Sequence, residues 1–127
     1  MAEWVLDSSA VLAWLMLEPG AEVVEPALPG SLISSVNVAE VVSRLVDLGR
    51  TDAQAIGSVS LSEFSVVDFD QDLAFRAGGL RRVTRQVGLS LGDRACLALA
   101  EREGLPVLTA DRAWAALDIG VEIRLIR

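Results

Sequence analysis

The chain of 127 residues contains no histidine, no lysine and no tyrosine, and it has one cysteine, Cys96. These absences exclude an imidazole base, a Schiff-base lysine and a lysine that anchors phosphate. Acid–base chemistry must then come from carboxylates, from arginine as an electrostatic group, or from water activated by a metal. A lone cysteine also excludes an internal disulfide, and its place in the apolar stretch 95–100 predicts a buried thiol.

Long apolar runs are missing too. The longest, residues 10–17, is far too short to span a bilayer, and an acidic opening rather than a basic signal segment precedes it. We therefore expect a cytoplasmic protein, with residues 1–127 forming one domain. The net charge of −7 argues against binding nucleic acid through a broadly basic surface. Five of the eleven arginines nevertheless fall between positions 76 and 94, where Asp93 is the only acid.

Strand-like and helical segments alternate along the chain, which predicts an α/β fold with a parallel sheet. Runs rich in β-branched residues predict strands at 3–6, 31–34, 65–68, 106–109 and 122–125. Between them we expect helices at 9–17, 37–48, 52–61, 71–87, 92–103 and 112–117. Residues 21–25 are compatible with a further short helical turn. The helix 37–48 carries an apolar stripe, so one of its faces should lie on the sheet.

Four carboxylates stand where runs of apolar residues stop: Asp7, Glu40, Asp93 and Asp111. In a parallel α/β fold, strand ends and helix beginnings meet along one edge of the sheet, so these side chains can converge. Converging carboxylates repel one another unless a cation lies among them. Oxygen ligands of this kind select Mg²⁺ or Mn²⁺, which suits hydrolysis of a phosphodiester by a metal-activated water.

Each carboxylate also has a purely structural interpretation, because acidic residues favour helix N-termini. Asp7 and Asp111 can cap the helices that follow them. Ser90-x-x-Asp93 and Asn37-x-x-Glu40 both resemble capping boxes. Glu40 can in addition pair with Arg44 one helical turn later. Capping does not explain why four helix starts all use carboxylates, and this conjunction favours the metal site.

The same four segments resemble the motifs of PIN-domain ribonucleases, and within that group of VapC-type toxins from type II toxin–antitoxin systems. In chain order they are Val5-Leu6-Asp7-Ser8-Ser9-Ala10, Ser34-Ser35-Val36-Asn37-Val38-Ala39-Glu40-Val41, Leu89-Ser90-Leu91-Gly92-Asp93-Arg94-Ala95 and Val107-Leu108-Thr109-Ala110-Asp111-Arg112. The resemblance runs nearly end to end. It implies a PIN-like three-layer fold with a central, mostly parallel, roughly five-stranded sheet flanked by helices. It further implies a Mg²⁺ or Mn²⁺ site, endoribonuclease activity and inhibition by a VapB-like antitoxin.

Auxiliary residues follow from the same resemblance. Ser9 and Thr109 are expected to orient a carboxylate or a ligated water, although local capping and β-propensity also explain them. Arg81, Arg82 and Arg85 are candidates to hold RNA phosphates, the alternative being a solvated helix face. The three tryptophans are expected in the core or in an interface rather than stacked on bases.

Other functions stay open on the sequence. Aspartate-nucleophile phosphatases and receiver domains also begin with an aspartate after the first strand, but both ordinarily rely on a lysine. A non-catalytic PIN-like interaction module, and a PIN nuclease that processes RNA outside a toxin–antitoxin pair, remain alternatives. Residues 10–17 and 95–100 are apolar nearly all round and so need cover on more than one side, which predicts a homodimer and an antitoxin-binding groove.

Overall fold

The computed structural model describes the whole chain, Met1–Arg127. The strands are β1 (Trp4–Leu6), β2 (Ser31–Ser34), β3 (Ser65–Val67), β4 (Val107–Thr109) and β5 (Ile123–Leu125). The α-helices are α1 (Ser8–Leu15), α2 (Ala21–Val24), α3 (Ser35–Asp47), α4 (Asp52–Ser60), α5 (Gln71–Gly79), α6 (Arg81–Thr84) and α7 (Leu91–Glu103). Two 3-10 helices, η1 (Glu25–Gly30) and η2 (Arg112–Ala116), complete the chain. All five predicted strands are confirmed, each with its ends within one residue of the expected position.

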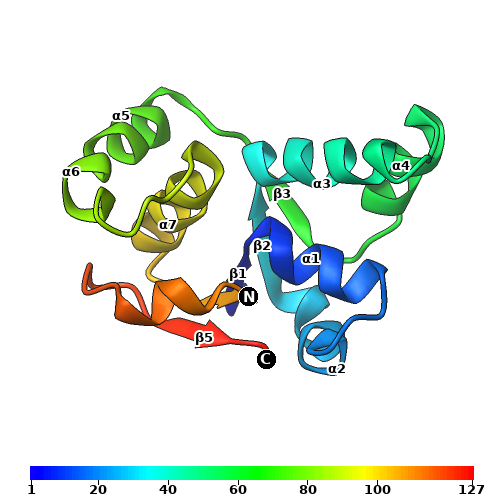
Figure 1. Ribbon diagram of the computed structural model, residues 1–127, viewed down its shortest axis with the longest axis horizontal. Helices are drawn as coiled ribbons and strands as arrows, with labels where there is room; N and C mark the ends of the chain where they lie inside the picture. Colours follow the sequence, from blue (N-terminus) through cyan, green and yellow to red (C-terminus); the bar gives the residue numbers. More distant parts are fainter.

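The five strands form one sheet in the order β3-β2-β1-β4-β5, and every neighbouring pair is parallel. Helices α1 to α4 lie on one side of this sheet and α5 to α7 on the other, which gives the three layers visible in Figure 1. The predicted α/β architecture is therefore confirmed. Parallel strands need crossover connections, and the helices supply them.

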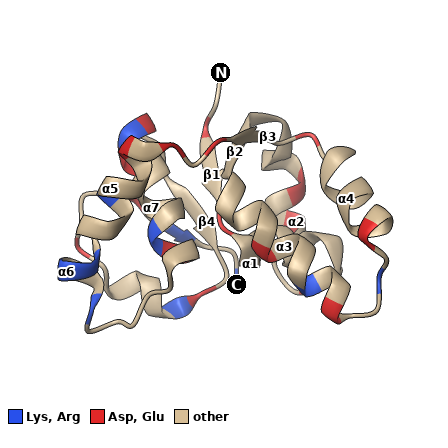
Figure 2. Ribbon diagram, turned by 90° about the horizontal axis from the view of Figure 1, so that it is seen from above, with Lys and Arg blue, Asp and Glu red and all other residues tan.

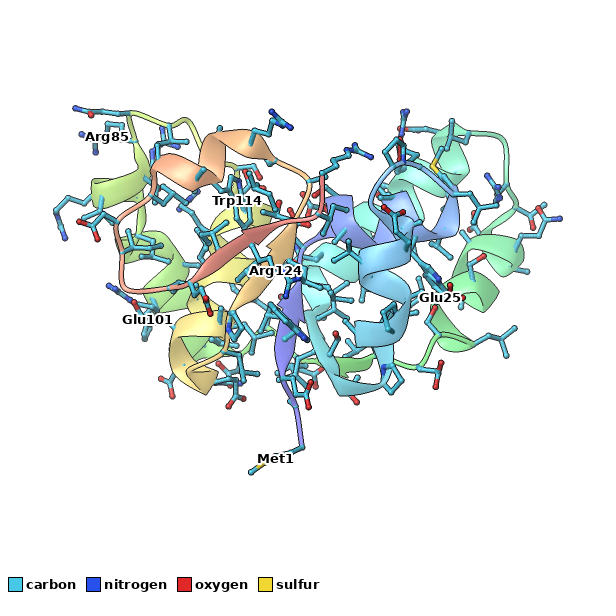
Figure 3. All side chains as sticks on the ribbon, turned by 90° about the horizontal axis from the view of Figure 1, so that it is seen from below. Met1, Glu25, Arg85, Glu101, Trp114 and Arg124 are labelled. Carbon is cyan, nitrogen blue, oxygen red and sulfur yellow. The ribbon has the colours of Figure 1, made fainter.

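Each face of the sheet has its own apolar core, because side chains alternate along a strand. Leu6 and Leu108 point to the face covered by α1 to α4, whereas Val5 and Val107 point to the face covered by α5 and α7. Trp114 of η2 is completely buried in the second core, and Figure 3 shows it pointing inward from its helix. Cys96 is buried as well, as the sequence predicted.

The strand order places a crevice next to β1. The chain runs outward from β1 through β2 to β3, then crosses back to add β4 at the other edge of β1. The connections that leave β1 and β4 therefore go in opposite directions, and such a switch point is where open α/β sheets bind ligands. Asp7 follows β1 directly, and Asp111 comes two residues after β4.

Some helical predictions were wrong in detail. The helix expected over 71–87 is two helices, α5 and α6, separated at Leu80, which is fully buried. Gly78 and Gly79 precede this break, and glycine is a weak helix former. The segment expected to be helical over 112–117 is a short 3-10 helix, and the turn near 21–25 forms α2. No helix is long and apolar enough to cross a membrane.

The helix α7 needs no partner chain to cover its apolar surface, contrary to the expectation for residues 95–100. All six of these residues are buried by the sheet and by neighbouring helices of the same chain. In contrast, the end of α1 stays open: Met16 and Leu17 are 37% and 86% exposed. Exposed apolar surface that a second chain could cover is therefore present at the end of α1 but not at residues 95–100.

Candidate active site

Asp7 is the best-buried carboxylate of the four, with 3% of its surface exposed. Its Oδ1 accepts hydrogen bonds from the Ser9 hydroxyl at 2.7 Å and from the Ala10 backbone N–H at 2.9 Å. Its Oδ2 accepts from the Thr109 hydroxyl at 2.6 Å and from Ser9 at 2.9 Å. Asp7 thus caps α1, as the structural interpretation predicted, and it also receives both of the hydroxyls expected to orient it.

Burial raises the pKa of Asp7 to about 6, because the ionised carboxylate loses hydration. The hydrogen bonds from Thr109, Ser9 and Ala10 act in the opposite direction, since they stabilise the charged form. The negative charge of Asp93 raises the pKa further. Asp7 therefore ionises less readily than an exposed aspartate, and nearby positive charge would favour its ionised form.

The two hydroxyls also join the ends of β1 and β4. Ser9 Oγ accepts from the Ala110 N–H at 2.9 Å, and Thr109 Oγ1 accepts from the Asp111 N–H at 3.0 Å. Each hydroxyl therefore donates to Asp7 while it accepts from the segment that carries Asp111. This network fixes the two strand ends relative to each other, although 102 residues separate Asp7 from Thr109.

Asp93 lies in the first turn of α7, where the predicted capping box with Ser90 is present. The Ser90 N–H donates to Asp93 Oδ2 at 3.0 Å, and the Asp93 N–H donates to Ser90 Oγ at 3.2 Å. Asp111 caps η2 by accepting from the Ala113 N–H through Oδ1 at 3.0 Å. Each cap uses one carboxylate oxygen, so Asp93 Oδ1 and Asp111 Oδ2 stay available to another ligand.

Glu40 lies in α3 and is not held as the sequence predicted. The residue that caps α3 is Ser34, so Asn37 is inside the helix and the expected Asn37-x-x-Glu40 capping box does not form. Instead the Asn37 side-chain amide donates to Glu40 Oε1 at 2.8 Å. None of the four ion pairs involves Glu40 or Arg44, so the expected pair between them is also absent.

The four carboxylates influence one another electrostatically. Partial burial raises the pKa of Asp93, and the charges of Glu40 and Asp111 raise it further. The buried Cys96 thiol, one turn after Asp93, has its pKa raised by burial and then by the charges of Asp7, Asp93 and Glu40. The Asn37–Gly92 hydrogen bond joins the first turns of α3 and α7, and α7 also packs on β1 and β4. In Figure 2 the two helices lie on either side of the central strands. The fold thus brings all four acidic positions into one region.

No three His, Cys, Asp or Glu side chains lie close enough together to hold one ion. The chemistry of the donor set does fit a hard divalent cation, since it offers only carboxylate and hydroxyl oxygens. The pKa values of Asp7 and Asp93 are raised by the cost of burying a charge and by repulsion from neighbouring carboxylates. A bound cation would offset both effects. The residues therefore suit Mg²⁺ or Mn²⁺ chemically.

The arginine segment lies apart from these carboxylates. Arg81, Arg82 and Arg85 are exposed on and directly after α6, and none of their guanidinium groups forms a hydrogen bond or an ion pair within the chain. Arg85 points outward at the edge of the molecule in Figure 3. Arg94 differs, because its guanidinium is partly buried and donates to the Ala77 carbonyl at 3.0 Å. This hydrogen bond ties α7 to α5.

Comparison with known proteins finds one matching protein family. A family model described as the PIN domain matches residues 4–120, which include all four carboxylates. A search of curated proteins finds no match.

Solved structures with the same fold include several toxin–antitoxin complexes. The DNA-bound VapBC of Salmonella typhimurium is 19% identical, with complete coverage of both chains and a TM-score of 0.76. VapBC-5 from Mycobacterium tuberculosis is 26% identical over 100% of this chain and 99% of that chain, with a TM-score of 0.62. VapC20 of the same organism, described as a toxin that cleaves the Sarcin-Ricin loop, is 14% identical over 94% and 99%, with a TM-score of 0.73.

Proposed function

The chain belongs to the PIN domain family, and from this premise we propose that it is a Mg²⁺- or Mn²⁺-dependent endoribonuclease that acts as the toxin of a toxin–antitoxin pair. The observation that carries the proposal is that the fold brings Asp7, Glu40 and Asp111 within electrostatic range of Asp93, next to the switch point between β1 and β4. Clustered, partly buried carboxylates are costly for a fold, and a site for a divalent cation gives them a use.

In this proposal Asp7 and Asp93 hold the cation directly, Asp111 completes the site with its free oxygen, and Glu40 contributes from α3. A bound divalent cation lowers the pKa of water and stabilises negative charge on the phosphate under attack. Ser9 and Thr109 keep the Asp7 carboxylate in one orientation through their hydrogen bonds, as residues behind metal ligands commonly do. The chain supplies no nucleophile of its own.

RNA binding is assigned to the exposed arginines that follow α5. Because the carboxylates repel phosphate, the substrate needs positive charge from elsewhere on the surface. Arg81, Arg82 and Arg85 are solvent-exposed and have no partner within the chain, so their guanidinium groups are free for phosphates. Because the net charge of the chain is −7, phosphate contacts of this kind need a local cluster of arginines.

The partner we propose is a short VapB-like antitoxin, together with a second copy of the chain. Support comes from similar structures that are complexes of toxin and antitoxin, among them VapBC-5. The antitoxin should place an arginine or lysine among the carboxylates, where positive charge is most needed. Its apolar anchors should contact exposed side chains such as Leu17.

Metal-dependent RNA cleavage by the purified chain tests the enzymatic part. Asp7→Asn, Glu40→Gln, Asp93→Asn and Asp111→Asn each delete charge but keep a hydrogen-bond acceptor, so the helix caps that involve the three aspartates survive. We expect parent cleavage with Mn²⁺ or Mg²⁺, none with EDTA, and strongly reduced cleavage in the amide variants. Asp118→Asn, at an exposed position outside the site, is the matched control.

Two results would redirect the proposal. If all four amide variants cleave RNA at the parent's rate, the site is not where we place it. If the parent binds an antitoxin but cleaves no RNA under any metal condition, the chain is a non-catalytic PIN-like interaction module.

A further inference from the structure

We propose that Asn37 and Gly92 are positioning residues for Glu40, and that they hold its carboxylate beside Asp93 so that both can serve one cation. The inference rests on the proposed metal site. It concerns two residues that the sequence motifs did not single out as functional, one in α3 and one in α7.

Asn37 connects the two helices through a single amide group. Its Nδ2 donates to Glu40 Oε1 at 2.8 Å and to the Gly92 carbonyl at 3.0 Å. Both amide protons are thereby used, one within α3 and one across to α7. The reverse orientation of the amide would set its oxygen against two acceptors, so the hydrogen bonds define which way it points. Asn37 thus fixes Glu40 to the backbone position directly before Asp93.

This role explains an otherwise unfavourable residue in the core. Asn37 is 1% exposed and continues the buried line of Val41 and Leu45 along α3, where an apolar side chain would fit the pattern. Its Oδ1 is buried without a hydrogen-bond partner, which is a cost to the fold. Asparagine therefore stabilises the fold less than an apolar residue would at this position, but its two N–H groups hydrogen-bond to Glu40 and to Gly92.

Gly92 provides the space that Glu40 occupies. It is buried in the first turn of α7, and a Cβ added there would overlap with the Glu40 carboxylate. The position does not need glycine for its backbone, because its φ is not positive. Since alanine favours a helix more than glycine does, the small residue is explained by the carboxylate that lies against it.

The test measures Mn²⁺ affinity by calorimetry, without relying on catalysis. Asn37→Leu removes the donors while it suits the buried line, and Gly92→Ala removes the space while it suits the helix. Each should weaken Mn²⁺ binding by about 10- to 100-fold, the range typical for residues that orient metal ligands, and melting temperatures in EDTA should not fall in parallel. Gly57→Ala is the control, because Gly57 lies in α4 with open space around its Cα.

A second set of variants asks whether both residues act through Glu40. In a Glu40→Ala background, neither Asn37→Leu nor Gly92→Ala should weaken Mn²⁺ binding further. Additional weakening there would overturn the inference, as would parent-like affinity of both single variants. If Glu40→Ala weakens binding but those two variants do not, the proposed function stands and the positioning role falls. If the parent binds no Mn²⁺, the proposed metal-dependent function and the positioning role are both wrong. Should Asn37→Leu fail to fold, Gly92→Ala carries the test alone.

A spectroscopic signature checks the hydrogen bonds without metal. Asn37 is the only asparagine in the chain, so selective ¹⁵N-asparagine labelling gives one side-chain amide pair. We expect two well-separated proton resonances with slow exchange in the parent. In Glu40→Ala, one of them should move towards the position of a free amide. An amide pair unchanged by that substitution would show that Asn37 does not hold Glu40.

Discussion

Replacing Asp7 by asparagine should stabilise the protein in the absence of metal, although it removes a residue at the centre of the site. The carboxylate is almost fully buried, and its pKa is about 6 rather than 3.8. A difference of about two pKa units corresponds to about 3 kcal/mol of destabilisation whenever the folded protein carries the ionised group. Asparagine removes that charge, so at pH 7 in EDTA the variant should gain up to about 3 kcal/mol.

Hydrogen bonding decides how much of this gain is realised. In the Asp7→Asn variant the amide oxygen can still accept from Ala10 and Ser9, so the cap on α1 is kept. The new amide nitrogen meets the Thr109 hydroxyl, which in the parent donates to Asp7 at 2.6 Å and must rotate to accept instead. We expect this rearrangement to offset about 1 kcal/mol, the net worth of one hydrogen bond. A net gain of about 2 kcal/mol remains from the loss of the buried charge.

The dependence of stability on pH tests independently whether the ionised Asp7 destabilises the metal-free fold. Because the folded pKa lies above the unfolded one, the folded state binds more protons between pH 6 and pH 3.8, and its stability rises as pH falls through this window. From pH 7 to pH 5 the metal-free parent should gain about 1.3 kcal/mol, or about 5 °C in melting temperature. Asp93, whose pKa is also raised, adds in the same direction. Lowered pKa values at Asp70 and Glu101 affect stability only at more acidic pH.

The assay is thermal unfolding of the parent, Asp7→Asn and Asp118→Asn at pH 5 and pH 7, with EDTA and with Mn²⁺. In EDTA the Asp7 variant should be the most stable at pH 7 and the least sensitive to pH. With Mn²⁺ the order should reverse, because the parent and the Asp118→Asn control gain binding free energy that Asp7→Asn largely loses. A parent whose stability is flat between pH 7 and pH 5, or an Asp7 variant less stable than the parent in EDTA, would refute the reasoning.

Three further outcomes are expected. Changing Arg81, Arg82 and Arg85 together to glutamine should weaken RNA binding and lower the salt slope by about 0.7 per lost phosphate contact, measured by fluorescence anisotropy; an unchanged slope means that they contact only solvent. Leu17→Gly should stabilise the chain by roughly 0.5 to 1 kcal/mol in chemical denaturation, because Leu17 is exposed and left-handed at φ 54°. A variant less stable than the parent would show that the Leu17 side chain makes contacts in solution. The chain should be a homodimer at tens of micromolar in sedimentation, and a monomer there contradicts the proposed assembly.

The sequence by itself determined the architecture and the acidic positions. Alternation of short β-branched runs with amphipathic segments is a local property, so five strands and the parallel sheet followed from it, with ends correct to within one residue. The helix starts at Asp7, Ser90 and Asp111 were predicted for the same reason, since a cap depends on the next three residues only. The sequence could also place Asp7, Asp93 and Asp111 at strand ends and helix starts, whereas Glu40, expected in a first turn, lies in the second turn of α3.

The features that only the tertiary structure decided depend on contacts between residues far apart in the chain. The break at Leu80 depends on where that side chain finds a core, which no local pattern encodes. The sequence pattern indicates a helix cap at Asn37, but Ser34 takes that place, and Asn37 is turned inward to Glu40 and to Gly92, 55 residues away. The raised pKa of Asp7 arises from burial beneath elements that close over β1. Burial and long-range contacts exist only once the chain is folded, because chain segments far apart in sequence must first be packed together.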